Sequence, residues 1–406
     1  MPEPFASIAP APRPPGSGAY QQLVKRALAL VPRLAERAAR NEAARGLLPE
    51  TVADLHAAGL FRSLQPMRVG GAELDYVALV DLGAELARGD ASVAWVVTNI
   101  ASHHWMLAMW PEAAQDLLWG DDPDILIASS FVFPAGKAER VEGGYRLSGR
   151  WPFSSGVDCC TWSMLGGIVR ASGPQPQHRI FLVPESGYYE VLDTWHASGL
   201  AGTASHDVLI RETFVPEHMS VAVADLKGGP APGAAVNRGP LYRIPVFALF
   251  PHIVTGPALG NAEAALEEVS GAMGGRFSNY SGAELAQFQT MQMRIAEAGS
   301  RVDAARLMMR AACLEAGEDA RAGIVPDMEK KLRIRRDAAF AVNLCTEAVS
   351  ILYRAAGARA LYTKDSLQRR FRDAHAVAAH ISFNFDVVGP AWGRVALGLE
   401  PDNPTL

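Results

Sequence analysis

Residues 288–312 read FQTMQMRIAEAGSRVDAARLMMRAA, and this stretch decides the fold class. Its apolar side chains recur at alternating steps of three and four residues, a spacing that places them on one face of an α-helix. The same spacing returns from Ile334 to Ala355. Many of these positions are alanine, so two long helices can approach each other closely. We therefore expect them to pack as antiparallel neighbours in a helical bundle.

The length of the first helix bears on assembly. A helix from Gly282 to Gly317 would extend about 54 Å at 1.5 Å per residue. In a chain of 406 residues, a helix of that length commonly projects into a subunit interface. We therefore expect a homo-oligomer, either a homotetramer or a homodimer.

The rest of the chain divides into segments of different character. Residues 20–122 are predicted to form an N-terminal helical domain. Residues 123–225 hold short β-favouring runs without helical crossovers, which predicts a mostly antiparallel barrel or sandwich. A linker at 226–243 leads into the bundle at 244–406, and the proline-rich residues 1–19 are predicted to be a disordered leader. The predicted fold class is α+β, mostly α.

Composition and charge exclude several classes of protein. Hydrophobic residues make up 49% of the chain, enough for a buried core and too many for a disordered protein. The net charge of −5, without a basic cluster, argues against nucleic acid as a partner. No apolar run reaches the roughly 18 residues that cross a bilayer, and the N-terminus lacks a signal-peptide pattern. The four cysteines form no CxxC pair, so we expect reduced thiols, no metal site and a cytoplasmic protein.

Two histidines lie on different apolar segments and could carry chemistry. His103 shares the segment Ser92–Met109 with Trp95, where a histidine could equally be a core residue bonded to a backbone carbonyl. His380 follows His375 by five residues, so the two do not share one helix face and a metal pair is not expected.

Serines at strand ends are the other candidates. Ser129 ends an apolar run, and Ser154 and Ser155 close the string WPFSSG at 151–156. Such serines could equally be turn residues. The chain contains no nucleophile elbow, P-loop, HExxH or GxGxxG motif, so the usual means of holding a nicotinamide cofactor is missing.

Taken together, six strings resemble the acyl-CoA dehydrogenase fold. They are SVAW (92–95), GRWPFSSG (149–156), SGLAGTAS (198–205), DVLIRETFVPEH (207–218), FQTMQMRIAEA (288–298) and RRFRDAHA (369–376). Within that fold they are similar to the group D two-component flavin-dependent monooxygenases, such as the oxygenase components of 4-hydroxyphenylacetate hydroxylase and secosteroid phenol hydroxylase. The resemblance extends from about residue 20 to residue 395.

The resemblance implies a monooxygenase that hydroxylates an aromatic or heteroaromatic small molecule through a flavin C4a-hydroperoxide. Its cofactors would be O2 and reduced FMN or FAD (FMNH2 or FADH2). A separate NAD(P)H:flavin reductase would supply the reduced flavin.

The resemblance also implies roles for individual flavin-site residues. Ser154 would bond to flavin N5, with Trp151, Phe153 and Ser155 around the ring. Two arginines would bind the flavin phosphate, Arg243 in LYRIP and Arg276 in GRFSNY, although each could equally be a solvated surface residue.

At the substrate, the resemblance makes His380 the base that accepts a phenolic proton. His103 and Ser129 would contact the substrate hydroxyl, and Trp95 and Phe247 would form apolar walls of the substrate site.

Other functions remain open on the sequence. Common acyl-CoA dehydrogenases carry a glutamate base eight residues after the aspartate of the RDA motif, which is Ile381 here, counted from Asp373. Isoleucine cannot accept a proton, but a dehydrogenase with an atypical base stays an alternative. So do a flavin-dependent N- or S-oxygenase and a non-catalytic scaffold. The loop Gly199–Ser205 also departs from the family pattern GLRGTGS, with Ala201 and Ala204 in place of an arginine and a glycine.

Overall fold

The computed structural model describes residues 18–170, 176–279, 281–401, 403 and 405–406. Almost all of the predicted leader at 1–19 therefore lies outside the described residues. The N-terminal helices are α1 (Gly18–Ala44), α2 (Pro49–Ala57), α3 (Ala78–Gly89), α4 (Ala91–Leu107) and α5 (Glu112–Trp119). Almost every residue of α4 is buried, as expected for a helix that is apolar all round.

The strands form one eight-stranded sheet. They are β1 (Ile127–Ser130), β2 (Gly136–Val141), β3 (Gly144–Ser154), β4 (Trp162–Val169), β5 (Gln177–Pro184), β6 (Glu190–Leu192), β7 (His206–Pro216) and β8 (Ser220–Ala222). Their order is β6-β7-β3-β2-β4-β5-β8, with β1 paired to β4. Most pairs are antiparallel, as predicted, but β1 and β2 each pair with β4 in parallel, so the sheet is mixed.

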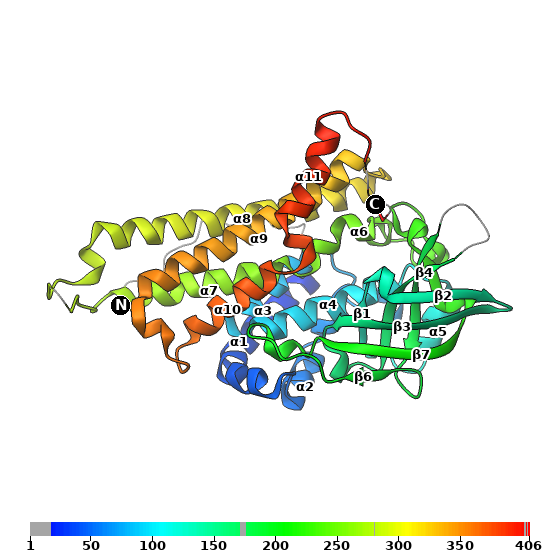
Figure 1. Ribbon diagram of the computed structural model, residues 1–406, viewed down its shortest axis with the longest axis horizontal. Helices are drawn as coiled ribbons and strands as arrows, with labels where there is room; N and C mark the ends of the chain where they lie inside the picture. Colours follow the sequence, from blue (N-terminus) through cyan, green and yellow to red (C-terminus); the bar gives the residue numbers. More distant parts are fainter. Residues whose placement is uncertain (1–17, 171–175, 280, 402, 404) are drawn as a thin grey trace.

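The C-terminal half is helical. Its helices are α6 (Val246–Leu249), α7 (Thr255–Met273), α8 (Gln289–Ala322), α9 (Met328–Ala356), α10 (Ser366–Ala378) and α11 (Phe385–Ala396). Figure 1 shows α7, α8 and α9 running side by side away from the strands, with α1 to α4 beneath them. The apolar face predicted from Ile334 to Ala355 is confirmed, because all seven positions that the spacing marks are buried. They are Ile334, Ala338, Ala341, Cys345, Ala348, Leu352 and Ala355.

The predicted start of the long helix is wrong by seven residues. Gly282 has φ +68° and lies in a turn in which the Ala283 carbonyl accepts from the Ser278 amide. A short 3-10 turn, Leu285–Gln287, then precedes α8. The helix runs on to Ala322 and ends at Gly323 with φ +72°, the left-handed conformation that commonly stops helices.

The close approach of α3 and α7 gives a stability prediction. A Cβ added at Gly260 would lie 1.8 Å from the Ala84 carbonyl oxygen, whereas one at Gly271 on the same helix would meet nothing within 4 Å. Helix propensity alone predicts that Gly→Ala stabilises either site by about 0.5–1 kcal/mol. We expect Gly271→Ala to follow that rule and Gly260→Ala to lower the free energy of unfolding by about 1–3 kcal/mol or more. Urea unfolding of both variants checks this, and a stabilised Gly260→Ala would contradict the packing.

Among the described residues, no helix is long and apolar enough to cross a membrane. No group of three or more His, Cys, Asp or Glu side chains in that part of the chain could hold a metal ion.

Candidate active site

His103 is fixed in one tautomer by the first strand of the sheet. It is 1% exposed, and its Nδ1 lies 2.5 Å from the Ile127 carbonyl oxygen. A carbonyl can only accept, so Nδ1 carries the proton and Nε2 of the neutral ring holds a lone pair. Nε2 has no partner among the described residues. Burial lowers the pKa of His103 to about 4, so the ring is neutral near pH 7 and Nε2 can accept a hydrogen bond.

His380 is held in the opposite tautomer. It precedes the short 3-10 turn Ile381–Phe383, and its Nδ1 accepts from the Ser382 amide at 3.2 Å. The neutral ring therefore carries its proton on Nε2. Burial, helped by the charge of Arg335, lowers the pKa of His380 to about 4. His380 thus presents a hydrogen-bond donor where the sequence predicted a base.

Ring contacts connect the two histidines. His103 lies 6.3 Å from Phe131, and Phe131 lies 5.7 Å from Phe250, measured between ring centroids. Phe250 lies 6.5 Å from His380, which in turn lies 5.8 Å from Trp95. Residues from α4, the segment after β1, the segment after α6 and the turn after α10 therefore form one aromatic cluster.

The other predicted substrate residues adjoin this cluster. Phe247 is 6.0 Å from Phe131 and 6.0 Å from Phe250. Ser129 lies on β1 between Ile127 and Phe131 and keeps some exposed surface. Trp95, His103 and Phe247 thus come together with His380, and Ser129 lies on the strand that leads to Phe131.

Ser154 ends β3 at an irregularity of the sheet. Trp151 pairs with Val208 and Ser154 with His206, so one extra residue of β3 is left out of the register. Within this bulge Phe153 has φ +65°, a conformation that costs energy outside glycine and is concentrated at functional sites. Ser154 is 0% exposed, and its hydroxyl has no partner among the described residues.

The neighbouring serine is, by contrast, fully bonded. Trp95 Nε1 donates to Ser155 Oγ at 3.0 Å, and Thr203 Oγ1 donates to the Leu200 carbonyl at 2.9 Å. Ser205 Oγ lies between them, 2.8 Å from Ser155 Oγ and 2.7 Å from Thr203 Oγ1. Because each hydroxyl has one proton, every bond is made only if the donors run from Trp95 toward Leu200. This series of hydrogen bonds, from Trp95 to the Leu200 carbonyl, fixes the Trp95 ring against His380.

The loop Gly199–Ser205, which supplies Thr203 and Ser205 to these hydrogen bonds, is anchored to α10. The Leu200 amide donates to Asp373 Oδ1 at 2.7 Å, and a Cβ at Gly199 would lie 2.3 Å from the Arg372 carbonyl oxygen. Ala204 has φ +44°, in the left-handed region, where the family pattern has a glycine. The RDA motif therefore positions the loop beside Ser155.

Two residues predicted around the flavin ring lie in contrasting environments. Trp151 is 0% exposed and its Nε1 donates to the Gly166 carbonyl at 2.6 Å. It packs inside the β domain beside the bulge, and its contact with a bound ring stays a prediction. Phe153 is 63% exposed and is available to a ligand.

The two predicted phosphate-binding arginines lie on different segments of the C-terminal half. Arg243 is exposed at the end of a 3-10 turn, Pro240–Arg243. Arg276 donates to the Ala356 carbonyl at 3.3 Å and lies between α7 and α8. Figure 1 shows that this connection is at the end of the bundle far from the strands.

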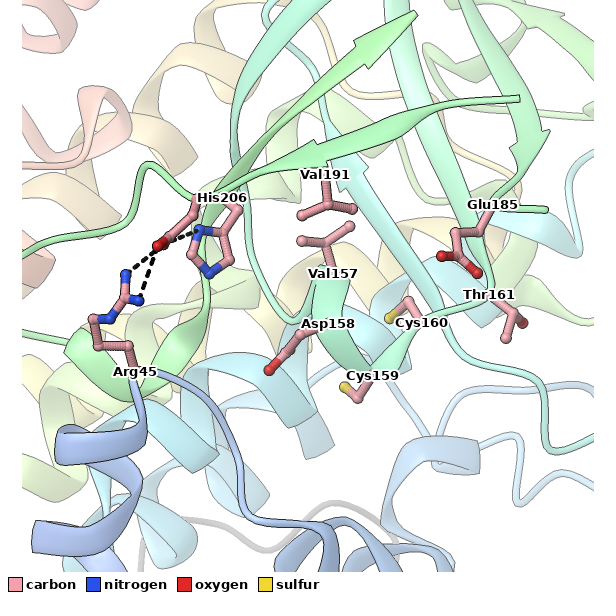
Figure 2. Close-up of a pocket in the computed structure, with 10 residues that line it drawn as sticks. Arg45, Val157, Asp158, Cys159, Cys160, Thr161, Glu185, Val191 and His206 are labelled. Atoms are coloured by element: carbon pink, nitrogen blue, oxygen red, sulfur yellow. Dashed lines mark hydrogen bonds and ion pairs between the residues drawn. The ribbon is translucent and has the colours of Figure 1, made fainter. Parts of the chain in front are cut away.

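A pocket lies beside the turn that follows Ser154. It measures about 560 Å³ and is lined by Arg45, Val157, Asp158, Cys159, Cys160, Thr161, Glu185, Val191, Asp193 and His206. Figure 2 shows Asp158, Cys159 and Cys160 along one wall of the pocket, and Arg45 at another, where it forms an ion pair with Asp193. The lining has no Phe, Tyr or Trp and includes none of the candidates, so we do not place an aromatic substrate there.

Sequence reasoning missed three contributors to the site. Phe131 follows Ser129 by two residues, and this proximity was an available signal. Ser205 and Arg335 gave none, since the first lies in a glycine-rich loop and the second in the charged string KKLRIRR.

The residues fit the flavin that the resemblance implies. A buried hydroxyl without a partner needs one from outside the described structure, and Ser154 Oγ can donate to or accept from a flavin ring nitrogen. The exposed ring of Phe153 beside it offers an apolar surface.

Comparison with known protein families agrees with this architecture. A family model described as acyl-CoA dehydrogenase, N-terminal domain, matches residues 19–119. A second, described as acyl-CoA dehydrogenase, C-terminal domain, matches residues 252–385.

Individual proteins are similar over nearly the whole chain. The FADH(2)-dependent resorcinol hydroxylase, oxygenase component, of Rhizobium sp. (strain MTP-10005) is 35% identical, over 96% of this chain and 98% of the relative. The crystal structure of 3-HSA hydroxylase from Rhodococcus sp. RHA1 is 32% identical with a TM-score of 0.89, covering 95% of this chain and 99% of that one. XiaF from Streptomyces sp., in complex with FADH2 and glycerol, is 29% identical with a TM-score of 0.87, covering 95% and 98%.

Proposed function

The chain belongs to the family of flavin-dependent monooxygenase oxygenase components with the acyl-CoA dehydrogenase fold, and on this premise we propose the reaction and the residues that perform it. It is the oxygenase component of a two-component enzyme that hydroxylates an aromatic small molecule, using O2 and reduced flavin from a separate reductase. When bound, reduced flavin activates O2 and supplies the oxygen atom that enters the ring.

The opposite tautomers of the two buried histidines are the observation that supports this reaction best. An ionised phenol is a much stronger nucleophile than a neutral one, so the site needs a group that removes the phenolic proton. His103 Nε2 has the free lone pair for that step. His380 Nε2–H can then donate to oxygen in the same cluster. We therefore exchange the two roles that the sequence suggested.

Other residues position the ligands. Ser154 is proposed to bond to flavin N5, and Phe153 to contact the flavin ring. Trp95, held by Ser155, would form one wall of the substrate site, and Phe247 the opposite one, with Ser129 at the substrate hydroxyl. The buried cluster excludes water from this space.

The dehydrogenase alternative lacks a base in this structure. Ile381, at the position of the usual glutamate, is 64% exposed. Burial is the main cause of the lowered pKa of both histidines, and the charge of Arg335 adds to it at His380. Neither His103 nor His380 makes an ion pair with a carboxylate in the part of the chain that the structure describes.

The assembly and the flavin tail complete the proposal. We propose a homotetramer or homodimer in which Arg276 and Arg243 bind the flavin phosphate, Arg276 from a neighbouring subunit. Exposed apolar side chains on the C-terminal helices support an interface, among them Leu307 at 49%, Phe340 at 47% and Phe385 at 41%. The four cysteines are unpaired, which supports a cytoplasmic location.

Reductase-dependent turnover tests the reaction class. The purified protein should be nearly colourless and should hydroxylate phenols such as resorcinol only when a flavin reductase and NADH are present. A yellow protein with tightly bound oxidised FAD that is bleached by an acyl-CoA thioester would instead identify a dehydrogenase.

Two substitutions at His380 test its proposed donor role. Gln can replace Nε2–H with an amide N–H, whereas Asn keeps only the acceptor for the Ser382 amide. We expect His380→Asn to lose about ten- to a hundredfold in hydroxylation rate, the value of a hydrogen bond to a charged group, and His380→Gln to stay within a few-fold of wild type. Steady-state product formation measures both, and equal losses would favour the base role.

A further inference from the structure

Arg335 lacks the counter-charge that its neighbours on α9 have. Arg333 pairs with Glu315 at 2.6 Å, and Arg336 with Asp337 at 2.6 Å. The Arg335 guanidinium, in contrast, donates to the Phe247 carbonyl at 2.6 Å and makes no ion pair within the described residues. Burial lowers its pKa to about 10, in keeping with the lack of a carboxylate partner in the part of the chain that the structure describes.

This arginine lies against the aromatic cluster. Its one hydrogen-bond partner belongs to Phe247, which is 6.0 Å from Phe250. Burial, with a smaller contribution from the charge of Arg335, lowers the pKa of His380 to about 4 and that of His252 to about 3. Helix α9 packs against both segments that carry these histidines. His252 is 0% exposed and neither of its ring nitrogens has a partner among the described residues.

A partly buried cation without an anion is costly, because a guanidinium gives up part of its hydration when protein packs against it. The two histidines are neutral near pH 7, so Arg335 is the charged group here, and it has no carboxylate partner among the described residues. The charge is balanced if the ligand of the cluster brings an anion with it. Arginine suits this purpose, since its planar N–H groups match the geometry of an oxyanion.

We propose that Arg335, with His380 beside it, recognises an oxyanion of the aromatic substrate, so that the site selects phenols bound as phenolates or aromatic acids over neutral aromatics. The inference rests on the proposed function and names the class of substrate that the same site takes. It assigns Arg335 as a specificity-determining residue.

Equilibrium binding of three small aromatics to the full chain, without flavin, tests the proposal. 4-Nitrophenol carries a phenolate that absorbs visible light, benzoate carries a carboxylate, and 4-nitroanisole is a neutral analogue of the first. Arg335→Met should weaken 4-nitrophenolate or benzoate binding by about ten- to a hundredfold and leave 4-nitroanisole binding unchanged. Whichever anion is affected identifies the source of the oxyanion.

Two further variants separate recognition from structural damage. Arg335→Lys keeps the charge and should bind the anions within several-fold of wild type. Arg333→Met removes a paired arginine from the same helix and should bind all three probes as wild type does. The proposal is overturned if the wild type binds none of the probes, or if Arg335→Met weakens all three equally. Neither result depends on turnover, so both are independent of the reductase assay.

Discussion

Replacing His103 by Asn should abolish most hydroxylation of phenols that are neutral at the assay pH. The Asn amide can still donate to the Ile127 carbonyl, as Nδ1 does at 2.5 Å in the native protein, but it has no counterpart of the free Nε2 lone pair. Positioned acid–base help is typically worth ~10²–10⁴-fold, and we expect a loss of that size in product formed per second.

The same variant provides its own control. A phenol that is already ionised at the assay pH needs no base, so His103→Asn should hydroxylate it at a rate close to wild type. Raising the pH through the pKa of a weakly acidic phenol should likewise restore turnover of that phenol. Equal losses for ionised and neutral phenols would contradict the base role of His103.

Replacing Ser154 by Ala should leave the stability of the protein unchanged but lower the yield of hydroxylated product per O2 consumed. The Ser154 hydroxyl is buried without a partner in the described structure, so its removal costs no bond and should change the free energy of unfolding by less than about 1 kcal/mol. If this hydroxyl bonds to flavin N5, the variant should form H2O2 about tenfold faster than the wild type. Product and H2O2 formed per O2 consumed measure the effect.

Ser163 provides the matched control for Ser154. It is also a 0% exposed strand serine, but its hydroxyl donates to Tyr189 Oη at 3.1 Å. Ser163→Ala should therefore lower the free energy of unfolding by about 1 kcal/mol and leave the yield of product per O2 unchanged. A Ser154→Ala variant with normal yield would remove Ser154 from the flavin site.

The helices were predictable because their packing repeats along the chain. On α9, every position that the spacing of three and four residues marked as apolar is buried. The packing of the folded protein therefore follows the periodicity of the sequence there. The start of α8 was not predictable in the same way. Residues 282–288 lack a helix-breaking proline, and the turn at Gly282 is set by bonds across the turn to Ser278.

The short strands were harder to predict than the helices. Strand β2, GKAERV, is charged and only partly apolar, and its identity as a strand comes from its partners β3 and β4. Its parallel pairing with β4 depends on the order of strands in space, which local sequence does not encode.

At the site, the sequence was a good guide to which residues take part and a poor guide to the chemical role of each one. Trp95, His103, Phe247 and His380 do converge. Their chemical roles depend on bonds to distant backbone, such as the Ile127 carbonyl that fixes the His103 tautomer. The uncompensated charge of Arg335 depends on which acidic side chains face each residue of α9. Neither property can be read from the order of residues.

A single-turnover experiment with 18O2 tests most directly whether this cluster transfers oxygen to an aromatic ring. The protein is loaded anaerobically with reduced flavin and resorcinol, then mixed with buffer that contains 18O2, and the products are analysed by mass spectrometry. The account predicts one 18O atom per hydroxylated product in the wild type and mainly labelled H2O2 in Ser154→Ala. Labelled H2O2 without labelled aromatic product from the wild type, across resorcinol and a panel of other phenols, would contradict it.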